Sequence, residues 1–65
     1  MNYMYIVQTK TRDGDVTKQR ILSDLPLAKS MYRYDLAKAR SEDRVQLIRH
    51  EYGEFEDVIL EAVVV

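Results

Sequence analysis

The 65-residue sequence contains no cysteine and a single histidine, His50. Disulfides and thiolate metal sites are therefore excluded, and so is a metal site built from several histidines. A chain of this length buries only about 60% of the surface that its unfolded form exposes, so small domains usually need disulfides, a metal or a partner. Internal packing, self-association or a partner protein must supply the stability of this chain.

Long apolar runs are also missing from the sequence. A membrane-spanning helix needs about 20 predominantly apolar residues, and no run approaches that length. The first ten residues, MNYMYIVQTK, lack the basic start and apolar core of a signal peptide. We expect a soluble, cytoplasmic protein without membrane contact, and one domain over residues 1–65.

The charges nearly cancel, to a formal net charge of −1, but they are unevenly distributed. Residues 1–40 carry eight basic and four acidic side chains, whereas residues 41–65 carry two basic and seven acidic ones. Such an asymmetry can indicate an acidic or basic partner. The alternative is that the two halves interleave in the fold and the charges form ordinary solvated surface.

Two glycines and one proline punctuate the chain. Asp13-Gly14 lies between two strand-like runs and favours a two-residue hairpin turn, in which both turn residues take positive φ. Pairing then follows i + j = 27, which places Ile6 opposite Ile21. The two strands are expected at about residues 3–11 and 16–22.

The segment SDLPLAKSMYRYDLAKAR is predicted to form the helix. Ser23 or Asp24 can cap its free amides, and Pro26 suits the first turn, where no N–H is needed. Leu25 precedes proline and is biased away from helical angles, so the helix should start near residues 24–26. Apolar residues recur every three or four positions and form one stripe: Leu25, Ala28, Met31, Tyr32, Leu36 and Ala39.

The segment RVQLIRHEYGEFEDVILEAVVV is predicted to form a second hairpin around Tyr52-Gly53. A two- or four-residue loop gives pairing with i + j = 105, whereas an odd loop would turn the faces of one strand over. This register places one set of side chains toward the helix: Val45, Leu47, Val58, Leu60, Ala62 and Val64. It places a second set on the opposite face: Ile48, His50, Phe55, Ile59 and Val63.

The order of elements predicts an α+β fold, β-β-α-β-β, in which a four-stranded antiparallel sheet carries one helix on one face. A helix of about 15 residues is about 22 Å long and covers one face of such a sheet. Both faces are apolar, however, although a sheet with one wet face should alternate apolar and polar residues. The second face is either an interaction surface or partly covered by twist and loops.

We interpret the second face as a surface for a protein partner or for a second copy of the chain, as in a homodimer. The candidate partner-binding residues are Phe55, Ile59, Val63 and Ile48, with Tyr3 and Tyr5 if their face is open. The last strand has no lysine or proline, so it could also offer an edge for β-augmentation.

Signals of catalysis are absent from the sequence. There is no glycine-rich phosphate loop, and the acids of EFED (54–57) lack the spacing of a calcium loop. Neighbours of His50 in a strand point to the opposite face, and a lone strand histidine is usually a surface or interface residue. We expect no enzyme activity, no catalytic residue, no metal, no cofactor and no small-molecule substrate.

Nucleic-acid binding is the alternative function. Basic side chains cluster on the first hairpin, beside tyrosines on which bases could stack: Lys10, Arg12, Lys18 and Arg20. Against this interpretation, the pI of the sequence is about 5.7, whereas nucleic-acid-binding domains usually exceed about 9. A structural homodimer is a further alternative.

Residues 21–51, ILSDLPLAKSMYRYDLAKARSEDRVQLIRHE, read as a strand, a helix opened by Ser-Asp-Leu-x-x-Ala, and a strand with Val-x-Leu-x-Arg. In this pattern the chain resembles small phage- and prophage-encoded proteins that carry one helix between strands, such as the short host RNA polymerase inhibitors of T7-like phages. The resemblance covers about half the chain and carries no functional residue over. It implies that the protein acts by binding a larger enzyme, as anti-restriction or anti-CRISPR proteins also do.

Overall fold

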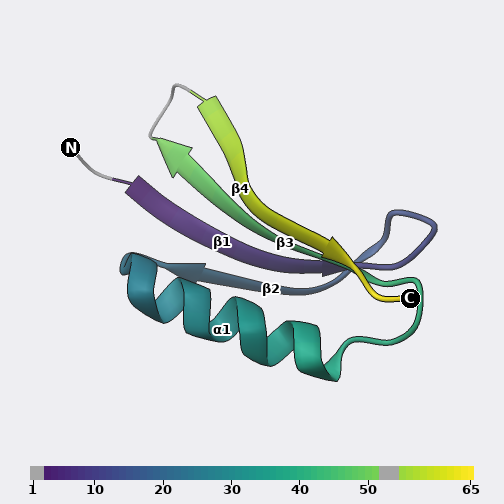
Figure 1. The fold of residues 1–65 in the computed structure, drawn as a ribbon. Helices are drawn as coiled ribbons and strands as arrows, with labels where there is room; N and C mark the ends of the chain where they lie inside the picture. The colour runs from purple at the N-terminus through teal and green to yellow at the C-terminus, as the bar shows by residue number, and fades with distance from the viewer. Residues whose placement is uncertain (1–2, 52–54) are drawn as a thin grey trace.

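In the part of the chain that the structure describes, four strands and one helix follow one another in the order β-β-α-β-β (Figure 1). The computed structural model describes residues 3–51 and 55–65 of the chain. The elements are β1 (Tyr3–Lys10), β2 (Val16–Leu22), α1 (Leu25–Lys38), β3 (Arg44–Glu51) and β4 (Phe55–Val63). The predicted α+β fold, with a four-stranded antiparallel sheet and one helix, is confirmed.

The strands lie in the order β2-β1-β3-β4, so β1 and β3 are central and β2 and β4 form the edges. The two central strands pair along their whole length, from Tyr3 opposite Glu51 to Lys10 opposite Arg44. This pairing joins strands on either side of the helix in the sequence. It places the three largest fully buried side chains, Val7, Val45 and Leu47, in the middle of the sheet.

The first hairpin has the predicted register, with Ile6 opposite Ile21. Its turn differs from the prediction, because among the described turn residues only Gly14 has positive φ, at 93°. The Gly14 amide donates to the Thr11 carbonyl over 2.9 Å, and the Thr11 amide donates to the Asp15 carbonyl over 2.8 Å. The loop is thus one residue longer than expected, and a bulge in the ladder beside Thr9 restores the predicted pairing.

The helix begins as its sequence predicts. The Asp24 carboxylate accepts a hydrogen bond from the Leu27 amide over 3.1 Å, and Pro26 occupies the first turn. Ala28 and Tyr32 are buried against the central strands. The other members of the predicted stripe pack around them: Leu25, Met31, Leu36 and Ala39.

The predicted register of the second hairpin is wrong. Leu47 lies opposite Leu60, which corresponds to i + j = 107, whereas Ile48 lies opposite Val58, which corresponds to i + j = 106. The change occurs at a bulge that leaves Ile59 without an opposite residue. Val58 therefore shares the face of Ile48 rather than the face of Leu47.

The bulge has a clear physical consequence. Between Ile48 and Glu51 the pairing follows i + j = 106 instead of the predicted 105, and a shift of one residue turns the faces of one strand over. The extra residue at Ile59 turns them back, so that Leu60 and Ala62 still share the face of Leu47 and Val45. The predicted turn at Tyr52-Gly53 lies outside the described residues.

Candidate interaction surface

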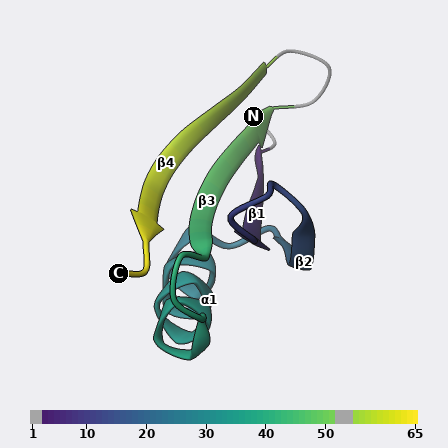
Figure 2. The same cartoon turned by 90° about the vertical axis from the view of Figure 1, so that its right-hand side faces the viewer.

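The two faces of the sheet differ in what covers them. Helix α1 packs on β1, β3 and β2 from one side, as Figure 2 shows with the helix seen nearly end-on. Val7 and Leu47 lie on this covered face, so their strand neighbours Ile6 and Ile48 lie on the other. In the described part of the chain no helix or strand packs on that second face, which we call the open face.

An apolar row crosses the open face. Four β-branched side chains stand directly opposite one another in successive strands: Ile21, Ile6, Ile48 and Val58. The ends of this apolar row are the most exposed, with Ile21 at 57% and Val58 at 48%, whereas Ile48 is buried between its neighbours at 7%. The apolar row therefore spans the full width of the sheet and is open to solvent at both ends.

A polar row runs parallel to the apolar row on the same face and is its next neighbour along the strands. Gln19 donates to Gln8 over 3.2 Å, Gln8 donates to Gln46 over 2.9 Å, and Gln46 donates to Glu61 over 2.6 Å. We call these four residues the glutamine row. Gln8 and Gln46 are each only 8% exposed, and a buried amide needs such partners to offset its lost hydration. The hydrogen bonds link side chains of all four strands in one continuous row.

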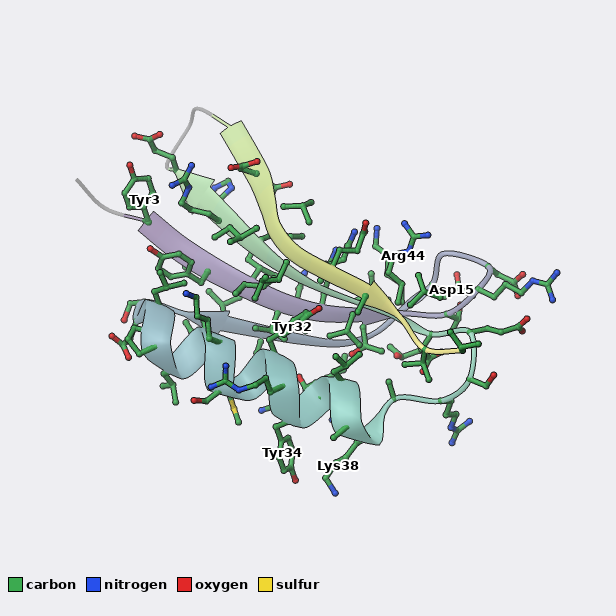
Figure 3. All side chains as sticks on the ribbon, viewed as in Figure 1. Tyr3, Asp15, Tyr32, Tyr34, Lys38 and Arg44 are labelled. Atoms are coloured by element: carbon green, nitrogen blue, oxygen red, sulfur yellow. The ribbon has the colours of Figure 1, made fainter. Side chains whose placement is uncertain are left out.

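Charged side chains bound the open face at both ends. Beyond the glutamine row lie Lys10 and Arg44, and the Arg44 guanidinium lies 3.3 Å from the Glu61 carboxylate. Figure 3 shows Arg44 on the side of the sheet away from α1. At the opposite border His50 lies 3.3 Å from Glu56. The open face is thus an apolar row with the glutamine row beside it. Basic and acidic side chains lie together at each of its two borders.

The predicted partner-binding residues are not brought together. Ile48 belongs to the apolar row, but Val63 lies beyond the glutamine row, opposite Arg44. Ile59 is the bulge residue and is 37% exposed. The backbone of Phe55 pairs with Glu51 and not with His50, and its side chain lies outside the described part of the structure.

Tyr3 and Tyr5 were included on the condition that their face is open. They alternate with Met4 and Ile6, so they lie on the face of Val7, which α1 covers. Tyr5 packs against the core, and the Arg49 guanidinium lies 5.1 Å from the centre of the Tyr3 ring. The face of Tyr3 and Tyr5 is therefore not the open face, and the two tyrosines do not join the candidate surface.

Sequence reasoning missed three members of the apolar row: Ile6, Ile21 and Val58. The pairing of Ile6 with Ile21 was predicted, and it was the only available signal. The pairing of Ile6 with Ile48 depends on the β1–β3 contact, which forms across the intervening helix. The position of Val58 depends on the bulge at Ile59.

The basic residues of the first hairpin point in different directions. Arg20 and Lys18 lie on the covered face, where Asp35 of α1 is only 3% exposed. The Arg20 Nε and Nη2 atoms donate to the two Asp35 carboxylate oxygens over 2.8 and 3.0 Å, and Lys18 Nζ lies 3.7 Å from the same carboxylate. The hydrogen bond to Asp35 raises the pKa of Arg20. This cluster fastens the helix to the edge strand β2.

The remaining two predicted bases lie elsewhere. Lys10 belongs to the open face, and Arg12 lies 3.5 Å from Glu42 near the hairpin tip. Tyr34 and Lys38 point away from the sheet in Figure 3, and the Lys38 ammonium lies 5.1 Å from the centre of the Tyr34 ring. The four basic residues proposed for nucleic acid therefore do not share one surface.

Two cavities flank the loop of the first hairpin. The larger, of about 390 Å³, lies between this loop and the C-terminal end of α1, with Thr17, Lys18 and Asp35 in its wall. The smaller, of about 310 Å³, is lined by Lys10, Arg12 and Glu42 among others. Each cavity holds basic and acidic side chains together. No group of three or more His, Asp or Glu residues that could hold a metal ion occurs within residues 3–51 and 55–65.

No protein family model, curated protein or solved structure gives a significant match to this chain. In the part of the chain that the structure describes, no helix is long and apolar enough to cross a membrane. The geometry of the chain itself is therefore the basis for a functional proposal, and the open face is its most distinctive feature.

Proposed function

We propose that this protein is a non-enzymatic interaction protein that binds another protein chain through the apolar row of its open face. The observation that carries the proposal is the direct pairing of Ile21, Ile6, Ile48 and Val58 across all four strands, with both ends of the row half exposed. A contiguous apolar patch with a polar rim is typical of a protein–protein interface.

The sheet edges are less suited to binding than the open face. The edge strand β4 carries three acids, Glu56, Asp57 and Glu61, and its ladder is bent by the bulge at Ile59. The other edge, β2, carries Lys18 and Arg20 and also contains a bulge, at Thr17. Bulges and charged side chains are the usual means by which edge strands avoid pairing with other chains. These features support the open face over β-augmentation.

The nucleic-acid alternative is weakened by the helix. The tyrosine-bearing face on which bases would stack is the covered face, where Tyr5 packs against the core. Arg20 and Lys18 lie beside the buried Asp35 carboxylate, so part of their charge is neutralised before any phosphate arrives. Inhibition of a larger enzyme, which the resemblance to phage-encoded proteins implies, is one form that the proposed interaction could take.

A pair of lysine substitutions tests the proposal. Val58→Lys places a charge in the apolar row, and Leu27→Lys places one on the helix at the same 48% exposure. We expect Val58→Lys to weaken binding at least about tenfold, because the charge must be desolvated in the interface. Leu27→Lys should bind like the parent chain, and both variants should have the thermal unfolding midpoint that the parent shows when it is too dilute to associate.

Binding is measured with the purified chain by light scattering during size-exclusion chromatography, and by affinity capture from the native cells. The two readouts cover a second copy and a foreign partner. If the parent chain binds nothing in either assay, or if Val58→Lys and Leu27→Lys bind equally well, the proposed function is wrong.

A further inference from the structure

We infer that the chain that binds the open face is a second copy of this protein, in a symmetric dimer with sheet packed on sheet. The inference rests on the proposed function and names its partner. Three observations support a second copy: the width of the apolar row, its symmetry, and the hydrogen-bonding capacity of the glutamine row.

The width of the apolar row favours a sheet as its partner. On the covered face, a single helix packs on β1, β3 and β2 but leaves Leu60 of β4 37% exposed. The exposed ends of the apolar row, Ile21 and Val58, lie on the two edge strands, three strand spacings or about 14 Å apart. One helix would again leave one edge uncovered, whereas a four-stranded sheet covers both.

The apolar row has nearly the same composition when read from either edge. A two-fold axis parallel to the strands, lying between two stacked sheets, reverses the order of the row in one copy. It places Ile21 against Val58 of the partner subunit and Ile6 against Ile48 of the partner subunit. Only β-branched side chains then meet, and sheets stacked in this way interdigitate at a spacing of about 10 Å.

The same axis places the glutamine row of one copy against the glutamine row of the partner subunit. Gln8 then meets Gln46 of the partner subunit, and Gln19 meets Glu61 of the partner subunit. Each of the three glutamine amides donates one of its two N–H groups within the row. The second N–H of each amide remains as a donor for the facing carbonyl or carboxylate. The strip that interrupts the apolar surface in one copy thus becomes a hydrogen-bonding strip between two copies.

The charged side chains at the borders of the open face are compatible with a two-fold axis parallel to the strands. Lys10 meets Arg44 of the partner subunit, but Arg44 already lies 3.3 Å from Glu61 of its own chain. A two-fold axis along the apolar row would instead stack the glutamine row on the row of Met4, His50 and Glu56. It would lose the pairing of amide with amide, because it places Gln8 against Met4 of the partner subunit and Gln46 against His50 of the partner subunit. We therefore favour the axis parallel to the strands.

The size of the open face sets the expected strength of the dimer. Four strands about 4.8 Å apart and eight residues long give an area of about 500 Å² per copy. Two such faces bury about 1,000 Å², which lies at the lower end of specific interfaces. We expect a dissociation constant of micromolar order rather than nanomolar order.

Cross-linking between single-cysteine variants tests the arrangement. Because the chain has no native cysteine, each variant carries only the thiol that was introduced. Ile21→Cys and Val58→Cys are mixed with a short thiol-reactive linker that spans the spacing of two sheets. We expect the mixture to form more cross-linked dimer than either variant alone, because each cysteine faces the other position of the partner subunit. Leu27→Cys, on the helix, is the matched control and should give none.

The outcomes separate this inference from the function that it rests on. If the parent chain stays monomeric from about 1 μM to about 1 mM, the second copy is excluded. The proposed function survives that result if Val58→Lys loses a foreign partner that Leu27→Lys retains. If Val58→Cys alone cross-links as well as the mixture, the copies meet about another axis or through β4, and the stacked arrangement is wrong.

Discussion

The two faces of one sheet are built from alternating residues of the same strands, yet they are organised differently. On the covered face the fully buried side chains Val7, Val45 and Leu47 meet Ala28 and Tyr32 of the helix. On the open face an apolar row and a glutamine row lie side by side. The comparison teaches that the covered face holds the fold together, whereas the open face offers a surface in which apolar and polar groups are sorted into strips.

Each face also contains a polar element with a different role. Asp35 on the covered side accepts hydrogen bonds from Arg20 of the edge strand, which joins two layers of the same molecule. The glutamine row joins strands within one layer, and its internal hydrogen bonds use one of the two N–H groups of each amide. The first arrangement is complete by itself, and the second can accept a further layer.

The largest effect should follow from a cavity in the covered face. Leu47→Ala removes a side chain with 0% exposure, and such changes cost about 2–5 kcal/mol. For a domain of this size that loss is a large fraction of the total stability. Urea unfolding measures it, with Ile21→Ala of the open face as the control, for which we expect well under half the loss. Equal losses would mean that the two faces do not differ in this way.

A smaller effect should follow from the buried carboxylate. Asp35→Asn keeps the shape of the side chain but removes the charge that Arg20 and Lys18 share, at a cost of about 1–3 kcal/mol. Asp57→Asn is the control, because Asp57 is exposed and lies 3.3 Å from Arg49, and exposed pairs contribute about 0–1 kcal/mol. The comparison uses urea midpoints in low salt. A cost for Asp35→Asn no larger than that for Asp57→Asn would show that Asp35 does not fasten the helix.

The smallest effect should appear at alkaline pH. Burial, and next the Glu61 carboxylate, raise the pKa of the Tyr32 hydroxyl above its ordinary value of 10.0. The folded state therefore favours the neutral hydroxyl, and this contribution to stability is present below pH 10 and is lost as the pH rises through the raised pKa. Between pH 9 and 11 the thermal unfolding midpoint should fall less steeply with pH for Tyr32→Phe than for the parent. Parallel curves would contradict this account of Tyr32.

The covered face was largely predictable from the sequence. The three- and four-residue spacing of Ala28 and Tyr32 predicted the buried stripe, and Asp24 with Pro26 predicted the start of the helix. Such signals are local, because they depend on neighbours within one or two turns. Asp35 was missed because its partner Arg20 lies on a strand, and that contact forms only in the tertiary structure.

The open face was predicted to exist, but its residues were only partly identified. Val58, Ile59 and Leu60 are all apolar, so nothing in their pattern marks Ile59 as the bulge or decides which face Val58 takes. The β1–β3 pairing that aligns Ile6 with Ile48 joins strands separated by the helix. A surface assembled from four strands depends on three registers, and an error in one of them moves every residue beyond it.

The most direct measurement of the central claim is an intermolecular methyl NOE experiment on a mixture of differently isotope-labelled copies. Within one chain, Ile21 and Val58 are separated by the two central strands, so no direct contact joins their methyl groups. Stacked open faces predict a cross-peak between Ile21 of one copy and Val58 of the partner subunit. They also predict a cross-peak between Ile6 of one copy and Ile48 of the partner subunit, which should disappear in Val58→Lys. A concentrated sample that shows no intermolecular cross-peak from the apolar row would contradict the account.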